Sequence, residues 1–119
     1  MKVFQRVMTL KPECLSDGLT AVVDTIEYMN ATSGQTWFGW QVLAGMPVGT
    51  VAVSTRADSW AALAETQAAM RADSGYMDRG DKVLATLSSA PQDWVMNPIA
   101  GVGNMPEAPE IIVQTINRA

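Results

Sequence analysis

Apolar residues recur near the start of the chain with two different periods. Residues 2–10 (KVFQRVMTL) carry apolar side chains on both alternating faces, interrupted by Gln5 and Arg6, which predicts a strand buried on both sides. Pro12 suits the first turn of a helix, where its missing N–H costs nothing. The next apolar residues are spaced alternately four and three apart, which predicts one face of a helix: Leu15, Leu19, Val22, Ile26 and Met29, with Val23 widening that face. Residues 30–34 (NATSG) end this helix.

A hairpin is predicted next. Residues 36–44 (TWFGWQVLA) and 48–56 (VGTVAVSTR) are rich in aromatic and β-branched residues, and the turn at 45–47 makes the two strands antiparallel. Alternation places Trp37 and Gln41 on one face of the first strand, and Phe38, Trp40 and Val42 on the other.

Helical signals return after the hairpin. Asp58 or Ser59 caps a helix that ends at 74–75, with an inner face of Trp60, Leu63, Ala64, Gln67 and Met70. A third, weaker helix is expected within residues 77–89, with Val83, Leu84 and Leu87 buried. A fourth strand is expected at 93–100, where Pro98 suits a strand end.

The last twenty residues have a different composition. Residues 101–109 (GVGNMPEAP) predict a linker, and 111–116 (IIVQTI) predict a short apolar strand that completes this chain's sheet or joins a partner's. We therefore expect a domain at 1–100 and a C-terminal arm at 101–119.

The order of elements, β-α-β-β-α-β, predicts an α+β domain with a four-stranded antiparallel sheet and helices on one face. Strands that are apolar on both faces need the second face covered as well. A partner sheet about 10 Å away would cover it, so we expect a homodimer or larger oligomer assembled through the sheet.

Composition narrows the partners. The 119 residues carry 8 basic and 12 acidic side chains, a net charge of −4 without a basic stripe, which argues against binding to nucleic acid or to an anionic membrane. No apolar run approaches the roughly 20 residues that span a bilayer, and no targeting segment is recognisable, so a cytoplasmic location is expected.

The chain has no histidine and a single cysteine, Cys14. It therefore lacks the commonest metal ligand, the usual haem ligand and the usual general base near neutral pH. A lone cysteine forms neither an intrachain disulfide nor a zinc cluster by itself. We expect no metal and no cofactor.

Several of these segments together carry a family resemblance. The hairpin at 37–44 and 48–56, followed by 58–64 (DSWAALA) and 94–96 (WVM), resembles the ferredoxin-like, dimeric α+β barrel superfamily over about residues 2–100. Within it, the chain is most similar to NIPSNAP-like and antibiotic-biosynthesis-monooxygenase-like proteins. The resemblance implies two four-stranded sheets packed face to face in a dimer, and a pocket between the sheet and helices of each subunit. It also implies that aromatic substrates can react with oxygen without a cofactor.

Nine polar or aromatic residues form the candidate site. Arg56, Gln41 and Asn97 are the candidate catalytic or orienting groups: a fixed cation at Arg56 can stabilise an enolate, a phenolate or a carboxylate, and all three side chains can orient a ligand. The candidate substrate-binding residues are Tyr28, Trp37, Trp40, Trp60, Gln67 and Trp94. The alternative is that the four tryptophans only anchor the core and an interface.

Two functions remain open. The first is a small-molecule enzyme, a cofactor-independent monooxygenase or isomerase acting on an aromatic or polyketide-like compound. The second is a non-catalytic protein that binds a small apolar ligand or serves in an oligomeric assembly. The absence of an obvious base favours the second, so the sequence does not decide whether the chain is an enzyme.

Overall fold

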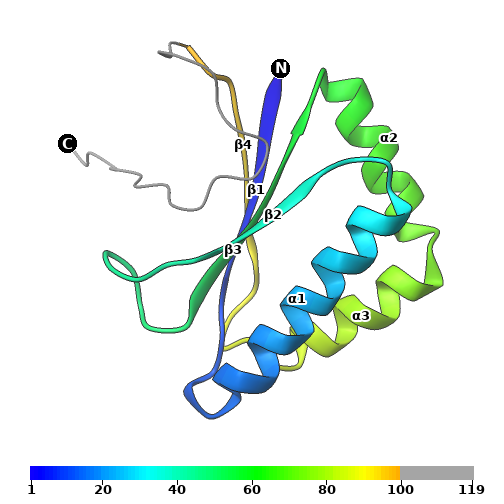
Figure 1. Cartoon of the computed structure of the whole chain (residues 1–119). Helices are drawn as coiled ribbons and strands as arrows, with labels where there is room; N and C mark the ends of the chain where they lie inside the picture. The colour runs from blue at the N-terminus through cyan, green and yellow to red at the C-terminus, as the bar shows by residue number, and fades with distance from the viewer. Residues whose placement is uncertain (100–119) are drawn as a thin grey trace.

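The computed structural model describes residues 1–99 as one four-stranded sheet with helices on one side (Figure 1). In chain order the elements are β1 Lys2–Thr9, η1 Pro12–Cys14, α1 Leu15–Thr32, β2 Trp37–Gln41, β3 Thr50–Ala57, α2 Trp60–Arg71, α3 Ser74–Leu84 and β4 Gln92–Met96. The strands lie in the order β2-β3-β1-β4, and every neighbouring pair is antiparallel. The predicted α+β class and order of elements are confirmed, with a short 3-10 helix before α1 and a third α-helix before β4.

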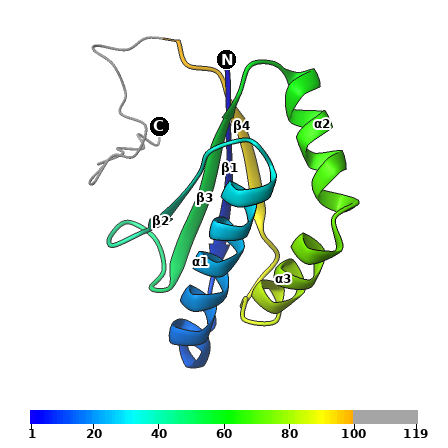
Figure 2. The same ribbon diagram turned by 45° about the vertical axis from the view of Figure 1, so that its right-hand side comes forward.

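Strand register decides which side chains face the helices. Phe4 pairs with Thr55, Arg6 with Val53 and Met8 with Val51, so the even-numbered residues of β1 share a face with the odd-numbered residues of β3. Figure 2 shows the three α-helices on one side of the sheet. We call the helix-facing side the inner face and the opposite side the outer face.

The core lies between the inner face and the helices. Leu10, just after β1, is only 1% exposed, and Phe4 meets Trp37 edge to face with ring centroids 6.1 Å apart. Helix α1 contributes Val22 and Met29, α2 contributes Leu63, and α3 contributes Val83. Leu15, Leu19 and Ile26 pack against this core, as their spacing predicts.

Side-chain caps mark where α2 and α3 begin. The Ser59 hydroxyl accepts a hydrogen bond from the Ala62 backbone N–H at 3.1 Å, which confirms one of the two predicted caps. Asp73 accepts a hydrogen bond from the Tyr76 N–H at 3.1 Å and so opens α3. Residues 74–75 therefore begin α3, and the prediction that they end α2 is wrong.

Four residues predicted to pack inward are exposed instead. Val23 and Ala64 lie outside the narrow stripe that each helix turns to the sheet. Leu84 is 52% exposed although it lines the cavity described below. Trp60, at the first position of α2, is 60% exposed. The burial expected for these four side chains is wrong.

The second and fourth strands are shorter than predicted. Residues 42–49 form the connection between β2 and β3, with positive φ at Gly45 and Gly49. The Gly49 carbonyl accepts a hydrogen bond from the Leu10 backbone N–H at 2.9 Å, which ties this connection to the end of β1. Strand β4 ends at Met96, and the predicted strand at 111–116 lies outside the described residues.

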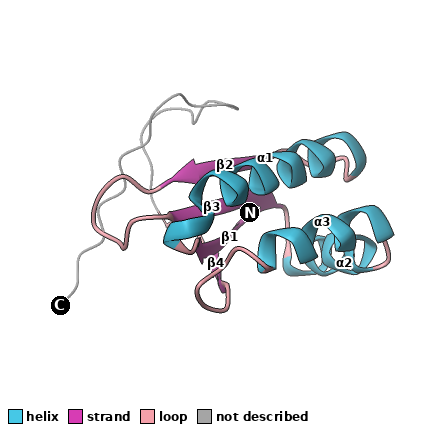
Figure 3. Ribbon diagram, turned by 90° about the horizontal axis from the view of Figure 1, so that it is seen from below, coloured by secondary structure: helices cyan, strands magenta, loops and turns pink. Residues whose placement is uncertain are grey.

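Aromatic side chains lie on the outer face of the sheet. The register places Phe38 and Trp40 of β2 there, together with Trp94 of β4, which is 54% exposed. Figure 3 shows that all the helices lie on the opposite side. No helix of residues 1–99 covers the outer face.

Candidate functional site

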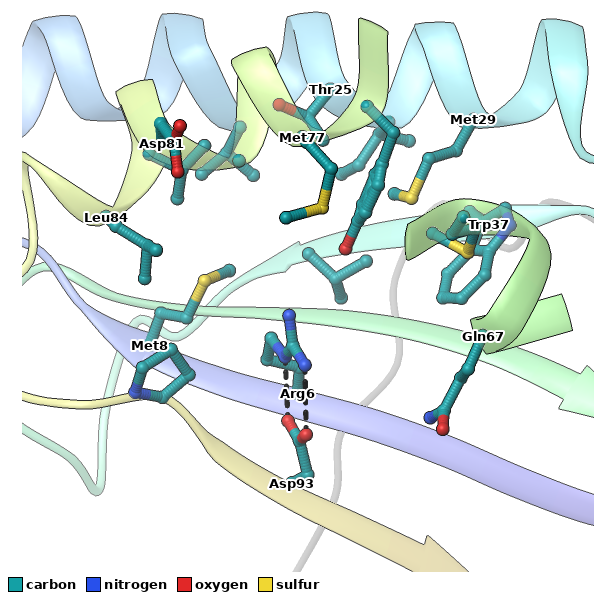
Figure 4. Close-up of a pocket in the computed structure, with 18 of the residues that line it drawn as sticks. Arg6, Met8, Thr25, Met29, Trp37, Gln67, Met77, Asp81, Leu84 and Asp93 are labelled. Atoms are coloured by element: carbon teal, nitrogen blue, oxygen red, sulfur yellow. Dashed lines mark hydrogen bonds and ion pairs between the residues drawn. The ribbon is translucent and has the colours of Figure 1, made fainter. Parts of the chain in front are cut away.

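A cavity of about 300 Å³ lies between the inner face of the sheet and the helices (Figure 4). All four strands and all three α-helices contribute to its walls. Arg71, Asp81 and Asp93 line it and are exposed, so they mark where the cavity meets solvent.

Much of the wall is apolar. Phe4 and Trp37 line it together with aliphatic residues and four methionines, which are Met8, Met29, Met70 and Met77. The Trp37 indole N–H donates to the Ser33 hydroxyl at 3.1 Å, and its backbone N–H donates to the Asn30 side-chain oxygen at 2.6 Å. The indole is therefore held in place, whereas methionine side chains can adapt to the shape of a ligand.

An ion pair crosses the mouth of the cavity. Arg6 of β1 stands opposite Asp93 of β4 in the antiparallel register. The Arg6 Nε lies 2.7 Å from Asp93 Oδ1, and Nη2 lies 3.0 Å from Oδ2, which is a two-pronged charge-assisted contact (Figure 4). The two side chains are 36% and 43% exposed, so the pair lies between apolar wall and solvent.

This pairing keeps the guanidinium charged. The hydrogen bond to Asp93 raises the pKa of Arg6 above its ordinary value, although burial opposes the shift, and Tyr76 makes a smaller contribution in the same direction. Arg6 is therefore a permanent cation beside a carboxylate.

Other polar side chains of the lining differ in whether they already make hydrogen bonds within the protein. The Thr25 hydroxyl already donates to the Ala21 carbonyl at 2.8 Å. The Tyr76 hydroxyl lies close enough to Arg6 to influence its pKa, whereas the Gln67 amide makes no side-chain hydrogen bond within residues 1–99 and is available to a ligand. The cavity thus offers hydrogen-bonding groups near an apolar compartment.

Only two of the nine candidate residues line this cavity. They are Trp37 and Gln67, both from the predicted substrate-binding set. Trp40, Arg56 and Trp94 lie on the outer face, where Arg56 is paired with Val3 and Trp94 with Gln5.

The remaining four candidates lie elsewhere. Tyr28 donates to Asp73 at 2.7 Å on the helical side, and Trp60 lies beneath the Lys2 ammonium, 5.5 Å from its ring centroid. Gln41 is exposed at the end of β2, and Asn97 accepts a hydrogen bond from Lys2. Gln41 and Arg56 stand near opposite ends of β3, since Gln41 pairs with Val51. The structure does not gather the three candidate catalytic residues, and their catalytic role stays a prediction.

Sequence reasoning missed Arg6, Tyr76 and Asp93 as site residues. A signal existed for one of them: Arg6 lies two residues from both Phe4 and Met8, so it occupies the same buried face of β1. A charge on such a face requires a partner. Its partner is 87 residues away, and only the sheet pairing reveals it.

Residues 1–99 contain neither a membrane-spanning helix nor a metal-binding cluster. No helix in this part of the chain is long and apolar enough to cross a membrane. In the same residues, no three side chains among aspartate, glutamate and cysteine gather in a way that could hold a metal ion.

Similarity to known proteins appears in structure and not in sequence. No family model matches the chain, and no curated protein matches it. Among solved structures, a NIPSNAP domain protein from Burkholderia xenovorans superposes with a TM-score of 0.74 at 14% identity, covering 87% of this chain and all of that one. A NIPSNAP family protein from Agrobacterium tumefaciens gives 0.71 at 14% identity, over 82% of this chain and 91% of that one.

A structure named as an antibiotic biosynthesis monooxygenase gives a TM-score of 0.65 at 13% identity, covering 84% of this chain and 100% of that one. The chain has the ferredoxin-like fold of these two groups. The resemblance seen in the sequence is confirmed at the level of fold. Identities this low show the fold alone.

Proposed function

We propose that this protein is a small-molecule enzyme, a cofactor-independent monooxygenase or isomerase, whose substrate is a compact aromatic or polyketide-like compound bound in the cavity. The observation that carries the proposal is the Arg6–Asp93 pair at the edge of an apolar compartment. A volume of about 300 Å³ lies at the lower end of the usual range for ligand pockets, which favours a molecule of one or two rings.

The pair supplies a base and a stabilising cation side by side. Asp93 can take a proton from an acidic C–H or O–H of the substrate, and the negative charge left on the substrate then faces the Arg6 guanidinium. The net charge of the site is unchanged by this transfer, because one carboxylate is neutralised as one substrate anion forms.

The substrate anion can then react in two ways that conserve atoms and electrons. In an isomerase, the proton returns to a different carbon of the same molecule. In a monooxygenase, an activated CH₂ group reacts with O₂ to give a carbonyl and one water molecule, whose two hydrogens come from the substrate. Tyr76 and Gln67 would orient the oxygen atoms of the substrate, and Trp37 would pack against its ring.

The outer face supports a second, non-catalytic reading. Phe38 and Trp40 on β2 and Trp94 on β4 lie near opposite edges of the outer face, which no helix of residues 1–99 covers. A second copy of the same face would bury it symmetrically, as expected for a homodimer. The alternative function is therefore a ligand-binding or assembly protein built on that dimer.

Two arginine substitutions separate the cavity from the outer face. We would screen one- and two-ring phenols and ketones for oxygen consumption or isomerisation, and compare Arg6→Ala with Arg56→Ala. We expect Arg6→Ala to lower kcat/KM by about 100-fold or more, as expected when a group that stabilises developing charge is removed. Arg56→Ala should then retain activity.

The opposite pattern would overturn the cavity proposal and support the catalytic role predicted for Arg56. Native mass spectrometry of the purified protein would report stoichiometry and retained ligand together. A dimer that holds a compound but turns over none of the screened compounds would favour the non-catalytic alternative.

A further inference from the structure

Among residues 1–99, the charged groups that line the cavity are two arginines and two aspartates, Arg6, Arg71, Asp81 and Asp93, and their charges cancel. The cationic group nearest the apolar wall, Arg6, already has a carboxylate on two of its five N–H groups. An entering ligand therefore meets hydrogen-bond donors without a net positive charge to neutralise.

This arrangement disfavours a ligand that arrives as an anion. A carboxylate placed beside Arg6 would have to displace Asp93 or lie next to it, and the second cation of the lining, Arg71, is balanced by Asp81. The anion would also lose water at the methionine and tryptophan wall. A neutral hydroxyl or carbonyl suffers neither cost and can still accept a hydrogen bond from Arg6.

We propose that the Arg6–Asp93 pair makes this cavity selective for neutral aromatic phenols and ketones over carboxylates of the same size. This inference rests on the proposed function only in taking the cavity as the ligand site. The selectivity lies in ground-state binding: negative charge appears on the ligand only after its proton has moved, when Asp93 has lost its own charge. Because the substrate binds neutral and gains its negative charge during the reaction, Arg6 stabilises the transition state more than it stabilises the bound substrate.

Calorimetric titration with two matched probes tests the selection. The probes are 2-naphthol, neutral at pH 7, and 2-naphthoate, its anionic analogue of similar size. For the unmodified protein we expect 2-naphthol to bind about tenfold more tightly or better, from the cost of desolvating an anion beside a guanidinium that already has a carboxylate partner. Asp93→Asn frees the guanidinium and should raise the affinity for 2-naphthoate about tenfold, the usual strength of a new charge-assisted contact.

Asp78→Asn is the matched control. It changes the net charge of the protein by the same amount as Asp93→Asn. However, Asp78 lies on α3, is exposed and does not line the cavity. Asp78→Asn should change the affinities for 2-naphthol and 2-naphthoate by no more than about twofold, because salt screens an exposed charge outside the lining. Since Asp93 is 43% exposed, Asp93→Asn should fold, and circular dichroism would check it.

Arg6→Gln gives an independent reading should Asp93→Asn fail to fold. It leaves Asp93 without its cation, so binding of 2-naphthoate should become weaker still. Equal affinities in the unmodified protein, a preference for 2-naphthoate, or a folded Asp93→Asn variant with no gain for 2-naphthoate would each overturn the selection while leaving the cavity as a ligand site. Failure of both probes to bind the unmodified protein would overturn the cavity itself, and the proposed function with it.

Discussion

Gly18 lies where α1 approaches the end of β1, and a single methyl group there should destabilise the fold. A Cβ built on Gly18 would stand 2.6 Å and 3.0 Å from the two methyl carbons of Leu10 and 3.1 Å from the Thr86 hydroxyl oxygen. Leu10 is 1% exposed, so its side chain has no free space into which to withdraw. Gly18→Ala therefore forces either the helix or the strand end to shift.

Two effects of opposite sign set the magnitude. Replacing a helical glycine by alanine favours the helix by about 1 kcal/mol. Overpacking a filled core typically costs about 1–3 kcal/mol. The net loss for Gly18→Ala is therefore about 0–2 kcal/mol.

Gly80 provides the matched control on α3. A Cβ at Gly80 would meet nothing within 4 Å, so Gly80→Ala should stabilise the protein by about 1 kcal/mol. The helix-propensity gain is common to both variants and cancels in their difference. That difference, about 1–3 kcal/mol, measures the close contacts of the added methyl group with Leu10 and Thr86.

Urea unfolding at one fixed protein concentration gives both free energies, and the fixed concentration removes any contribution from association. An equal stabilisation by the two substitutions would refute the close approach of α1 to Leu10. A destabilised Gly80→Ala variant would refute the open space assigned beside α3.

Three further predictions concern stability. The hydrogen bond between Tyr28 and Asp73 lowers the pKa of Asp73 and raises that of Tyr28, so the stability it contributes is complete between the unfolded values of about 4 and 10. This stability is lost as pH falls through the lowered pKa of Asp73 or rises through the raised pKa of Tyr28. Tyr28→Phe should remove the loss of stability at alkaline pH. If the urea midpoint of this variant varied with pH as in the unmodified protein, the prediction would be wrong. Trp37→Ala should cost about 3–5 kcal/mol in urea unfolding, as for other buried aromatic truncations, and a loss under 1 kcal/mol would show that its ring is not part of the core. Ser59→Ala should cost about 1 kcal/mol through loss of the α2 cap, whereas Ser59→Asp should retain most of the stability; equal losses in the two variants would argue against capping.

Local patterns predicted the elements well wherever one signal dominated. The spacing of Leu15, Leu19, Val22, Ile26 and Met29 identified the face of α1 that packs on the sheet. Alternation in β2 correctly separated the faces of Trp37 and Trp40. These features depend on neighbours within a few residues, which the sequence displays directly.

Element ends were predicted less well because side-chain caps compete there. Asp73 bonds the Tyr76 N–H and starts a new helix at a place where Ser74 and Gly75 look like a stop. The burial expected for Trp60 failed for a different reason. The apolar stripe of a helix need not be covered along its whole length, and the first turn of α2 lies toward solvent.

The sequence by itself determined which segments are strands and helices and where their apolar residues recur, because those preferences come from local backbone geometry and burial. Only the tertiary structure decided which residues share the cavity. The strand order β2-β3-β1-β4 brings Arg6 beside Asp93, 87 residues later, and puts Arg56 and Trp94 on the other side of the same sheet. A one-residue change in that register would move every side chain of a strand to the opposite face, so the site depends on long-range pairing that no local pattern encodes.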